Sequence, residues 1–155
     1  MIRPTLRLLA AALAGIACTA LAPPPPSGTF TIRVTNVRSA KGEVHVDVCP
    51  RTQFLKDDCP FAGSAPAKMG TTIVTVPGVP PNDYAVQAFH DENRNHRVDR
   101  VPLLGIPKEG VGFSNDAPIR MSPPKWDDAV VRFGGDQTIQ FKMRYFLGGS
   151  GPDSN

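Results

Sequence analysis

One stretch of the chain, His90–Ser114, holds its densest set of oxygen-bearing side chains. Hard cations such as calcium take six to eight oxygen ligands, and alternating Asp and Asn residues supply them because every second side chain turns inward. Side-chain ligands at positions 1, 3, 5 and 9 of a calcium-loop frame are provided here by Asp91, Asn93, Asn95 and Asp99. The backbone carbonyl of Arg97 falls at position 7. The spacing predicts a calcium site.

This frame departs from the EF-hand pattern at two positions. His96 stands where a glycine normally provides a positive φ, and Pro102 stands where a bidentate Glu is expected. Glu109 would supply a late carboxylate if the chain folds back on itself. The three acidic and three basic side chains of His90–Arg100 cancel, so a calcium site here is expected to be weak, with a dissociation constant of about 10⁻⁴–10⁻³ M. A metal-free loop rigidified by Asx-turns accounts for the same residues and is the slightly favoured interpretation.

The N-terminus has the pattern of a secretory signal peptide, predicted over residues 1–22. Arg3 and Arg7 precede a short apolar run, Leu8–Ala17, which is followed by small residues. We therefore expect a secreted protein of the bacterial periplasm. Lipid anchoring through Cys18 is the less favoured alternative, because the residues before it lack the leucine of a lipoprotein signal.

The remainder of the chain is nearly neutral. Without Arg3 and Arg7, 15 basic residues face 14 acidic ones, and no basic run predicts nucleic-acid binding. No second apolar stretch predicts a membrane span in the mature protein. Prolines 23–26 favour an extended linker over residues 23–28, followed by one domain over residues 29–147 and a disordered tail over residues 148–155.

Two cysteines remain after the signal peptide, Cys49 and Cys59. Cysteines ten residues apart in an oxidising compartment usually pair, which predicts a structural disulfide.

Alternating apolar and polar residues predict short strands separated by Gly- and Pro-rich turns. The predicted strands cover residues 30–34, 44–48, 71–76, 83–90, 126–133 and 138–146. The first two and the last two strands are each expected to form a hairpin, and residues 50–68 are expected to be irregular. About seven short strands, no long helix and one long loop predict an antiparallel β-sandwich.

The run Tyr84–Tyr145 resembles a bacterial family labelled domain of unknown function 2141. The matching motifs are HDENRN at His90–Asn95, GIPKEG at Gly105–Gly110, GFSND at Gly112–Asp116 and PPKWDDA at Pro123–Ala129. The resemblance implies a secreted sandwich of transthyretin-like or immunoglobulin-like fold, and it implies no established activity.

The favoured function is a non-enzymatic extracytoplasmic binding or envelope module, with calcium as a weak structural cofactor. Loops on a rigid sandwich commonly carry recognition. The expected contacts with a glycan or protein ligand are Gly112, Phe113, Ser114, Asn115 and Trp126.

Three other functions use residues of the same region. A carbohydrate-binding sandwich would stack sugars on Trp126, Tyr84 and Phe113. A hydrolase would use Ser114 and His90 with Asp91 or Glu109, although the nucleophile-elbow motif is absent. A transition-metal site would need His45, His90 and His96 to come together.

Overall fold

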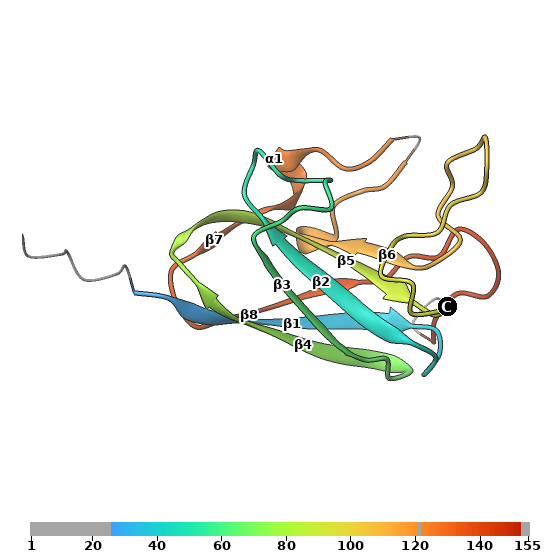
Figure 1. Ribbon diagram of the computed structural model, residues 1–155, viewed down its shortest axis with the longest axis horizontal. Helices are drawn as coiled ribbons and strands as arrows, with labels where there is room; N and C mark the ends of the chain where they lie inside the picture. Colours follow the sequence, from blue (N-terminus) through green and yellow to red (C-terminus); the bar gives the residue numbers. More distant parts are fainter. Residues whose placement is uncertain (1–25, 121, 153–155) are drawn as a thin grey trace, which may run out of the picture.

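The computed structural model describes residues 26–120 and 122–152. The predicted signal peptide, the first part of the predicted linker and residues 153–155 lie outside the described residues. The described chain forms eight strands in two facing sheets, with one short 3-10 helix and one α-helical turn (Figure 1). The prediction of an all-β sandwich is confirmed.

The first sheet has three strands in the order β4 (Gly70–Val79), β1 (Gly28–Val37) and β8 (Gln137–Lys142). β1 pairs with β4 in antiparallel fashion and with β8 in parallel fashion. The parallel register runs without a break from Phe30 opposite Gln137 to Thr35 opposite Lys142. The predicted antiparallel sandwich therefore contains one parallel pair of strands.

The second sheet has the order β3 (Phe61–Pro66), β2 (Glu43–Cys49), β5 (Asn82–Asp91) and β6 (Val111–Phe113), all antiparallel. β7 (Val130–Phe133) pairs with the first part of β5. β5 is thus a central strand, as its two apolar faces predict, and its last residue leads directly into the long loop of residues 92–110.

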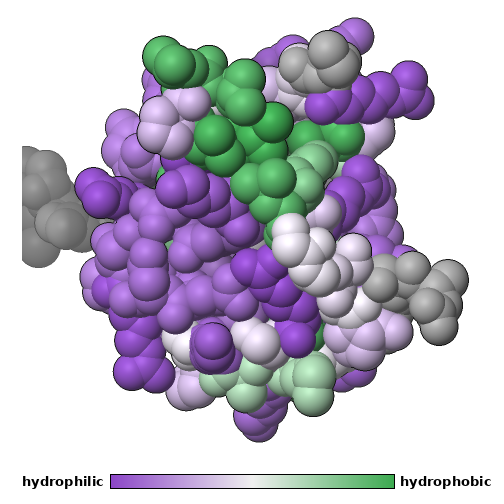
Figure 2. All heavy atoms as spheres, turned by 90° about the vertical axis from the view of Figure 1, so that its right-hand side faces the viewer, coloured by the Kyte–Doolittle hydropathy of each residue, from purple (hydrophilic) through white to green (hydrophobic). Residues whose placement is uncertain are grey.

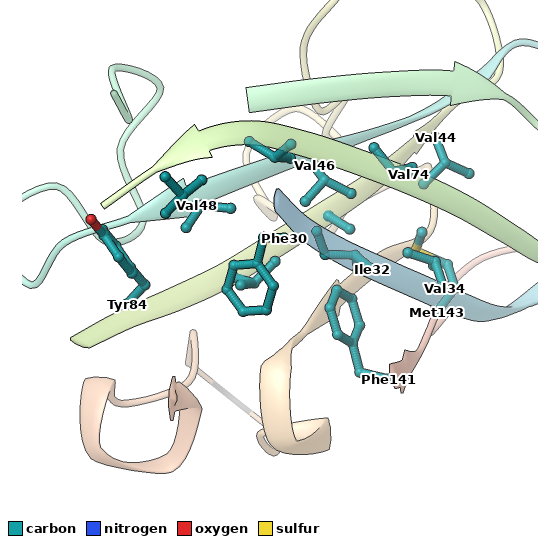
Figure 3. Close-up of a cluster of buried hydrophobic side chains, with 14 of the residues drawn as sticks. Phe30, Ile32, Val34, Val44, Val46, Val48, Val74, Tyr84, Phe141 and Met143 are labelled. Atoms are coloured by element: carbon teal, nitrogen blue, oxygen red, sulfur yellow. The ribbon is translucent and has the colours of Figure 1, made fainter. Parts of the chain in front are cut away.

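The core lies between the two sheets, where alternate side chains of each strand meet (Figure 3). Its fully buried side chains include Phe30, Ile32, Val34, Val44, Val46, Val48, Phe133, Phe141 and Met143. Each such burial contributes on the order of 1.5–3 kcal/mol to the free energy of folding. These residues all belong to the described strands and the segment just after β8, so residues 23–155 include every one of them.

Both predicted hairpins are wrong. β1 and β2 lie in different sheets, and so do β7 and β8, so each connection crosses from one sheet to the other. Alternation identifies a strand and its buried face, but it does not say which sheet the strand joins.

Two other segments differ from their predictions. Residues 50–68, expected to be irregular, contain the edge strand β3. The predicted strand over residues 126–133 begins with one helical turn, α1 (Trp126–Ala129), and only its second half is β7. The 3-10 helix η1 (Ser114–Asp116) follows β6 directly.

Cys49 and Cys59 form the predicted disulfide, which ties the end of β2 to the segment before β3. No helix within the described ranges is long and apolar enough to cross a membrane.

Candidate functional site: an acidic loop at the end of β5

Asp91 is the last residue of β5 and has no exposed surface. Its Oδ1 accepts a hydrogen bond from the backbone N–H of Asn95 at 3.0 Å. Its Oδ2 accepts one from the backbone N–H of His96 at 2.7 Å. A carboxylate accepts about four hydrogen bonds, so this buried group keeps acceptor capacity on both oxygens.

Asn93 and Asn95 turn the chain after Asp91. Their Oδ1 atoms accept hydrogen bonds from the backbone N–H groups two residues later, each at 3.1 Å, which is the Asx-turn geometry predicted for a metal-free loop. Their Nδ2 groups donate to the two oxygens of Asp99 at 2.7 and 3.0 Å. These amide hydrogen bonds lower the pKa of Asp99. The loop therefore closes around the Asp99 carboxylate.

Glu109 returns to this loop from the far end of the segment and is 4% exposed. Its Oε1 accepts a hydrogen bond from the Glu92 N–H at 3.1 Å, and its Oε2 accepts one from the Asp99 N–H at 3.2 Å. Burial raises the pKa of Glu109, and the nearby charges of Asp91 and Asp99 raise it further. The chain folds back as a late carboxylate ligand requires.

The backbone at His96 has a φ of 59°. This is the left-handed conformation for which a calcium-loop frame uses glycine, and it costs a residue with a side chain roughly 1 kcal/mol. Arg94 has the same φ of 59°. The loop thus adopts the backbone that the frame demands despite the absence of the glycine.

The base of the loop is fixed by close contacts with the connection between β1 and β2. A Cβ at Gly42 would lie 1.8 Å from the Asp91 carbonyl oxygen, so only glycine fits there. Arg38 forms an ion pair with Glu92. The hydrogen bond from Arg38 is the main cause that lowers the pKa of Glu92. The chain on either side of Asp91 is therefore held in place.

These groups suit a hard cation better than a soft one. Asp91 and Glu109 are buried carboxylates, and among the described residues no Lys or Arg forms an ion pair with either of them. The Asp99 carboxylate lies 3.8 Å from Arg97 Nε. Carboxylate oxygens are the ligands that calcium prefers. The Arg97 carbonyl stays a predicted ligand, whereas the Arg97 N–H is bonded to Asn95.

A second group of potential ligands joins Asp91 to Glu43 and His96. Glu43 pairs with Asp91 across β2 and β5, and His96 Nδ1 lies 3.5 Å from Glu43 Oε1 and 4.0 Å from Asp91 Oδ2. One ligand atom from each of the three lies within 4.8 Å of the others. Sequence spacing could not reveal this group, because Glu43 joins it only through strand pairing.

The histidines proposed for a transition-metal site are engaged elsewhere. Buried His90 hydrogen-bonds through Nδ1 to the Tyr145 hydroxyl and through Nε2 to the Lys41 carbonyl, both at 2.8 Å. Both ring nitrogens of His45 are bonded to other side chains as well.

Ser114 has no exposed surface. Its hydroxyl accepts a hydrogen bond from the Val86 N–H at 2.9 Å and donates one to the Ala129 carbonyl. Gly112 is also buried, and a Cβ there would lie 3.0 Å from the Phe141 ring. These two predicted contact residues therefore lie inside the domain, where they contact β5, β8 and α1. Asn115 is exposed and donates its amide to the Val130 carbonyl.

The aromatic residues proposed for sugar stacking do not share one surface. Tyr84 is 2% exposed and belongs to the core. Phe113 and Trp126 are partly buried and each packs edge-on against Phe54, with ring centroids 6.0 and 5.8 Å apart. The Arg51 guanidinium lies over the Trp126 ring. These aromatic side chains pack against a small second hydrophobic cluster.

The sequence did not reveal one hydrogen-bonded series of side chains of catalytic types. His45 bridges the Ser64 hydroxyl at 2.8 Å and the Asp47 carboxylate at 2.9 Å, and the hydrogen bond to Asp47 raises the pKa of His45. Ser64 lies in β3, which looked irregular in the sequence. It is exposed on an edge strand, and its hydrogen bond to His45 joins β3 to β2. We interpret these three side chains as a cross-strand polar ladder.

No curated protein and no solved structure matches the chain. A family model described as an uncharacterized protein conserved in bacteria (DUF2141) matches residues 32–140, from β1 to β8, and so includes both the sandwich and the acidic loop. The chain belongs to this bacterial family.

Proposed function

We propose that the chain is a non-enzymatic binding module of the bacterial cell envelope, secreted through its N-terminal segment, in which calcium stiffens the loop of residues 92–110. The observation that carries this proposal is that two buried carboxylates, Asp91 and Glu109, accept hydrogen bonds from backbone N–H groups of the turn that holds Asp99. Buried like charges repel one another, and a divalent cation would relieve that repulsion.

The state of the catalytic residue types supports a non-enzymatic role. Ser114 and His90 use their polar atoms in buried structural hydrogen bonds, so neither is free to attack or deprotonate a substrate. The loop of residues 92–110, unlike these buried side chains, has a large exposed segment at its tip. A rigid loop of this kind loses less conformational entropy on binding a partner.

Calorimetric titration of residues 23–155 with calcium tests this proposal. We expect a dissociation constant near the millimolar range, and calcium at ten times that constant should stabilise the fold by about 1.4 kcal/mol. The melting temperature should therefore fall when EDTA removes the ion.

A matched pair of variants assigns the heat to the loop. Asp99→Asn removes one of the proposed carboxylate ligands and is expected to weaken calcium binding at least tenfold. Asp127→Asn removes the same charge from an exposed site on α1, where Asp127 is 79% exposed, and should leave binding unchanged. Absence of heat up to several millimolar, with no effect of EDTA on melting, would reject the calcium site.

A further inference from the structure

The tip of the loop of residues 92–110 is a tight hairpin over residues 100–107. Arg100 and Pro107 form an antiparallel bridge, and the Val101 N–H donates to the Ile106 carbonyl at 2.8 Å. The Gly105 N–H donates back to the Val101 carbonyl at 3.0 Å. The Arg100 guanidinium donates to the Gly105 carbonyl at 3.1 Å. The hairpin is therefore held by its own hydrogen bonds.

This hairpin presents apolar side chains to solvent. Leu103 is fully exposed, Leu104 is 69% exposed and Ile106 is 36% exposed. Leu103 also has a φ of 69°, a conformation unfavourable for leucine. Among the described residues, the only other large apolar side chain exposed by more than half is Met69, which lies before β4.

The acidic and basic side chains around the hairpin differ in how deeply they are buried. The acidic groups point into the base of the loop: Asp91 and Glu109 are buried, and Glu92 is paired with Arg38. The exposed charged side chains are mainly basic, namely Arg94, Arg97, Arg100 and Lys108. The loop is close to neutral in total, yet its outer part is positive.

A hollow of mixed polarity lies beside the base of the hairpin. Its lining includes the apolar Leu55, Val98 and Phe113 together with the polar Asp57, Gln87 and Arg100. Figure 1 shows the hairpin, coloured gold, projecting at the loop end of the sandwich. Figure 2, which faces that end, shows hydrophobic side chains gathered in one band across the upper part of the surface.

We propose that this hairpin docks the protein onto an anionic phospholipid bilayer. Leu103, Leu104 and Ile106 would enter the boundary between headgroups and acyl chains, and the basic side chains behind them would lie at the level of the lipid phosphates. A projecting apolar tip backed by positive charge matches the two layers of such a surface in order of depth. The inference rests on the proposed function in taking this loop as the binding surface.

Flotation of residues 23–155 with vesicles tests the proposal. Binding is expected with vesicles that contain phosphatidylglycerol and should be much weaker with phosphatidylcholine alone, because the positive charges contribute only on an anionic surface. Leu103→Ser is expected to weaken partitioning roughly tenfold, since it removes one inserted leucine. Arg100→Gln and Lys108→Gln should each weaken it roughly fivefold on the anionic vesicles.

Met69→Ser and Ile73→Ser are the matched controls. They remove exposed apolar side chains, 68% and 49% exposed, from the β4 region and should leave partitioning unchanged. Equal losses in the controls and in Leu103→Ser would overturn the proposal, as would failure of the wild type to float with either vesicle. Self-association of the wild type that Leu103→Ser abolishes, without vesicle binding, would assign the hairpin to a second copy and would also overturn it.

The same experiment separates this proposal from the calcium site. The hairpin is closed by its own hydrogen bonds, so Asp99→Asn should still bind vesicles in EDTA even though it no longer binds calcium. Vesicle binding without any calcium heat would reject the calcium site alone. Calcium heat without vesicle binding would reject membrane docking alone.

Discussion

Phe30 and Asp91 are both fully buried, but the molecule stabilises them in different ways. Phe30 packs against the Phe133 ring with centroids 4.7 Å apart, and its neighbours come from both sheets. The buried Asp91 carboxylate accepts hydrogen bonds from backbone N–H groups of its own loop. The first arrangement depends on shape and removal from water, whereas the second depends on charge and hydrogen bonding. Conditions that change charge should therefore act on the loop and leave the sandwich intact.

The largest effect should come from the core. Phe30→Ala is expected to lower the free energy of unfolding by about 3–5 kcal/mol, because it leaves a cavity between the sheets. Urea denaturation measures this loss, which should be equal in calcium and in EDTA. Ile73→Ala, on the exposed face of the neighbouring β4, is the control and should cost much less. A calcium-dependent loss for Phe30→Ala would mean that core and loop are coupled.

The disulfide should come next. Replacing Cys49 and Cys59 together by Ala is expected to cost roughly 2–3 kcal/mol, because the unfolded chain regains the entropy of the loop between them. The same urea experiment measures the loss. It too should be independent of calcium, and a large change in calcium affinity would contradict the separation of the two regions.

A smaller effect should come from the strained turn of the loop. His96→Gly and Arg94→Gly each relieve a φ of 59°, and each is expected to raise the free energy of unfolding by about 0.5 kcal/mol after the entropy of glycine is offset. Hydrogen exchange of the loop amides locates the gain. A gain for Arg94→Gly with a loss for His96→Gly would mean that contacts of the His96 ring with Glu43 and Asp91 outweigh the strain.

The smallest effect should be the pH dependence contributed by His45, which lies on the sheet, away from the tip of the loop. Its pKa is raised by the hydrogen bond to Asp47, so the folded state holds the proton more tightly than the unfolded state. This stabilisation is present below the ordinary histidine pKa of about 6.5 and is lost as the pH rises through the raised value. His45→Gln should remove that part of the pH dependence. An unchanged profile would show that the ladder contributes nothing.

The sequence predicted the buried faces well because alternation reports burial directly. Ile32, Val46, Phe141 and Met143 lie in the core as their spacing requires. β3 escaped prediction because Phe61–Pro66 contains Gly, Ala and Pro in place of β-branched residues, and it is a strand through its pairing with β2. Pairing with the preceding strand outweighed the low strand propensity of these residues.

The candidate site was predictable only in part. The Asp/Asn spacing located the turn and its return to Glu109, since both are local in the chain. The Glu43 carboxylate and the close approach of Gly42 depend on strand pairing, which spacing does not encode. The exposure of Leu103 is equally hidden, because an apolar run in a sequence normally predicts burial.

The parallel pairing of β1 and β8 also determines how the domain responds to mechanical force. Tension applied through the segment before Gly28 and the segment after Lys142 acts on opposite ends of two parallel strands. The load is then directed along the strands, so the ladder from Phe30–Gln137 to Thr35–Lys142 is sheared as a unit and is not opened one pair at a time. A domain stretched between these two segments would resist extension at this pair of strands.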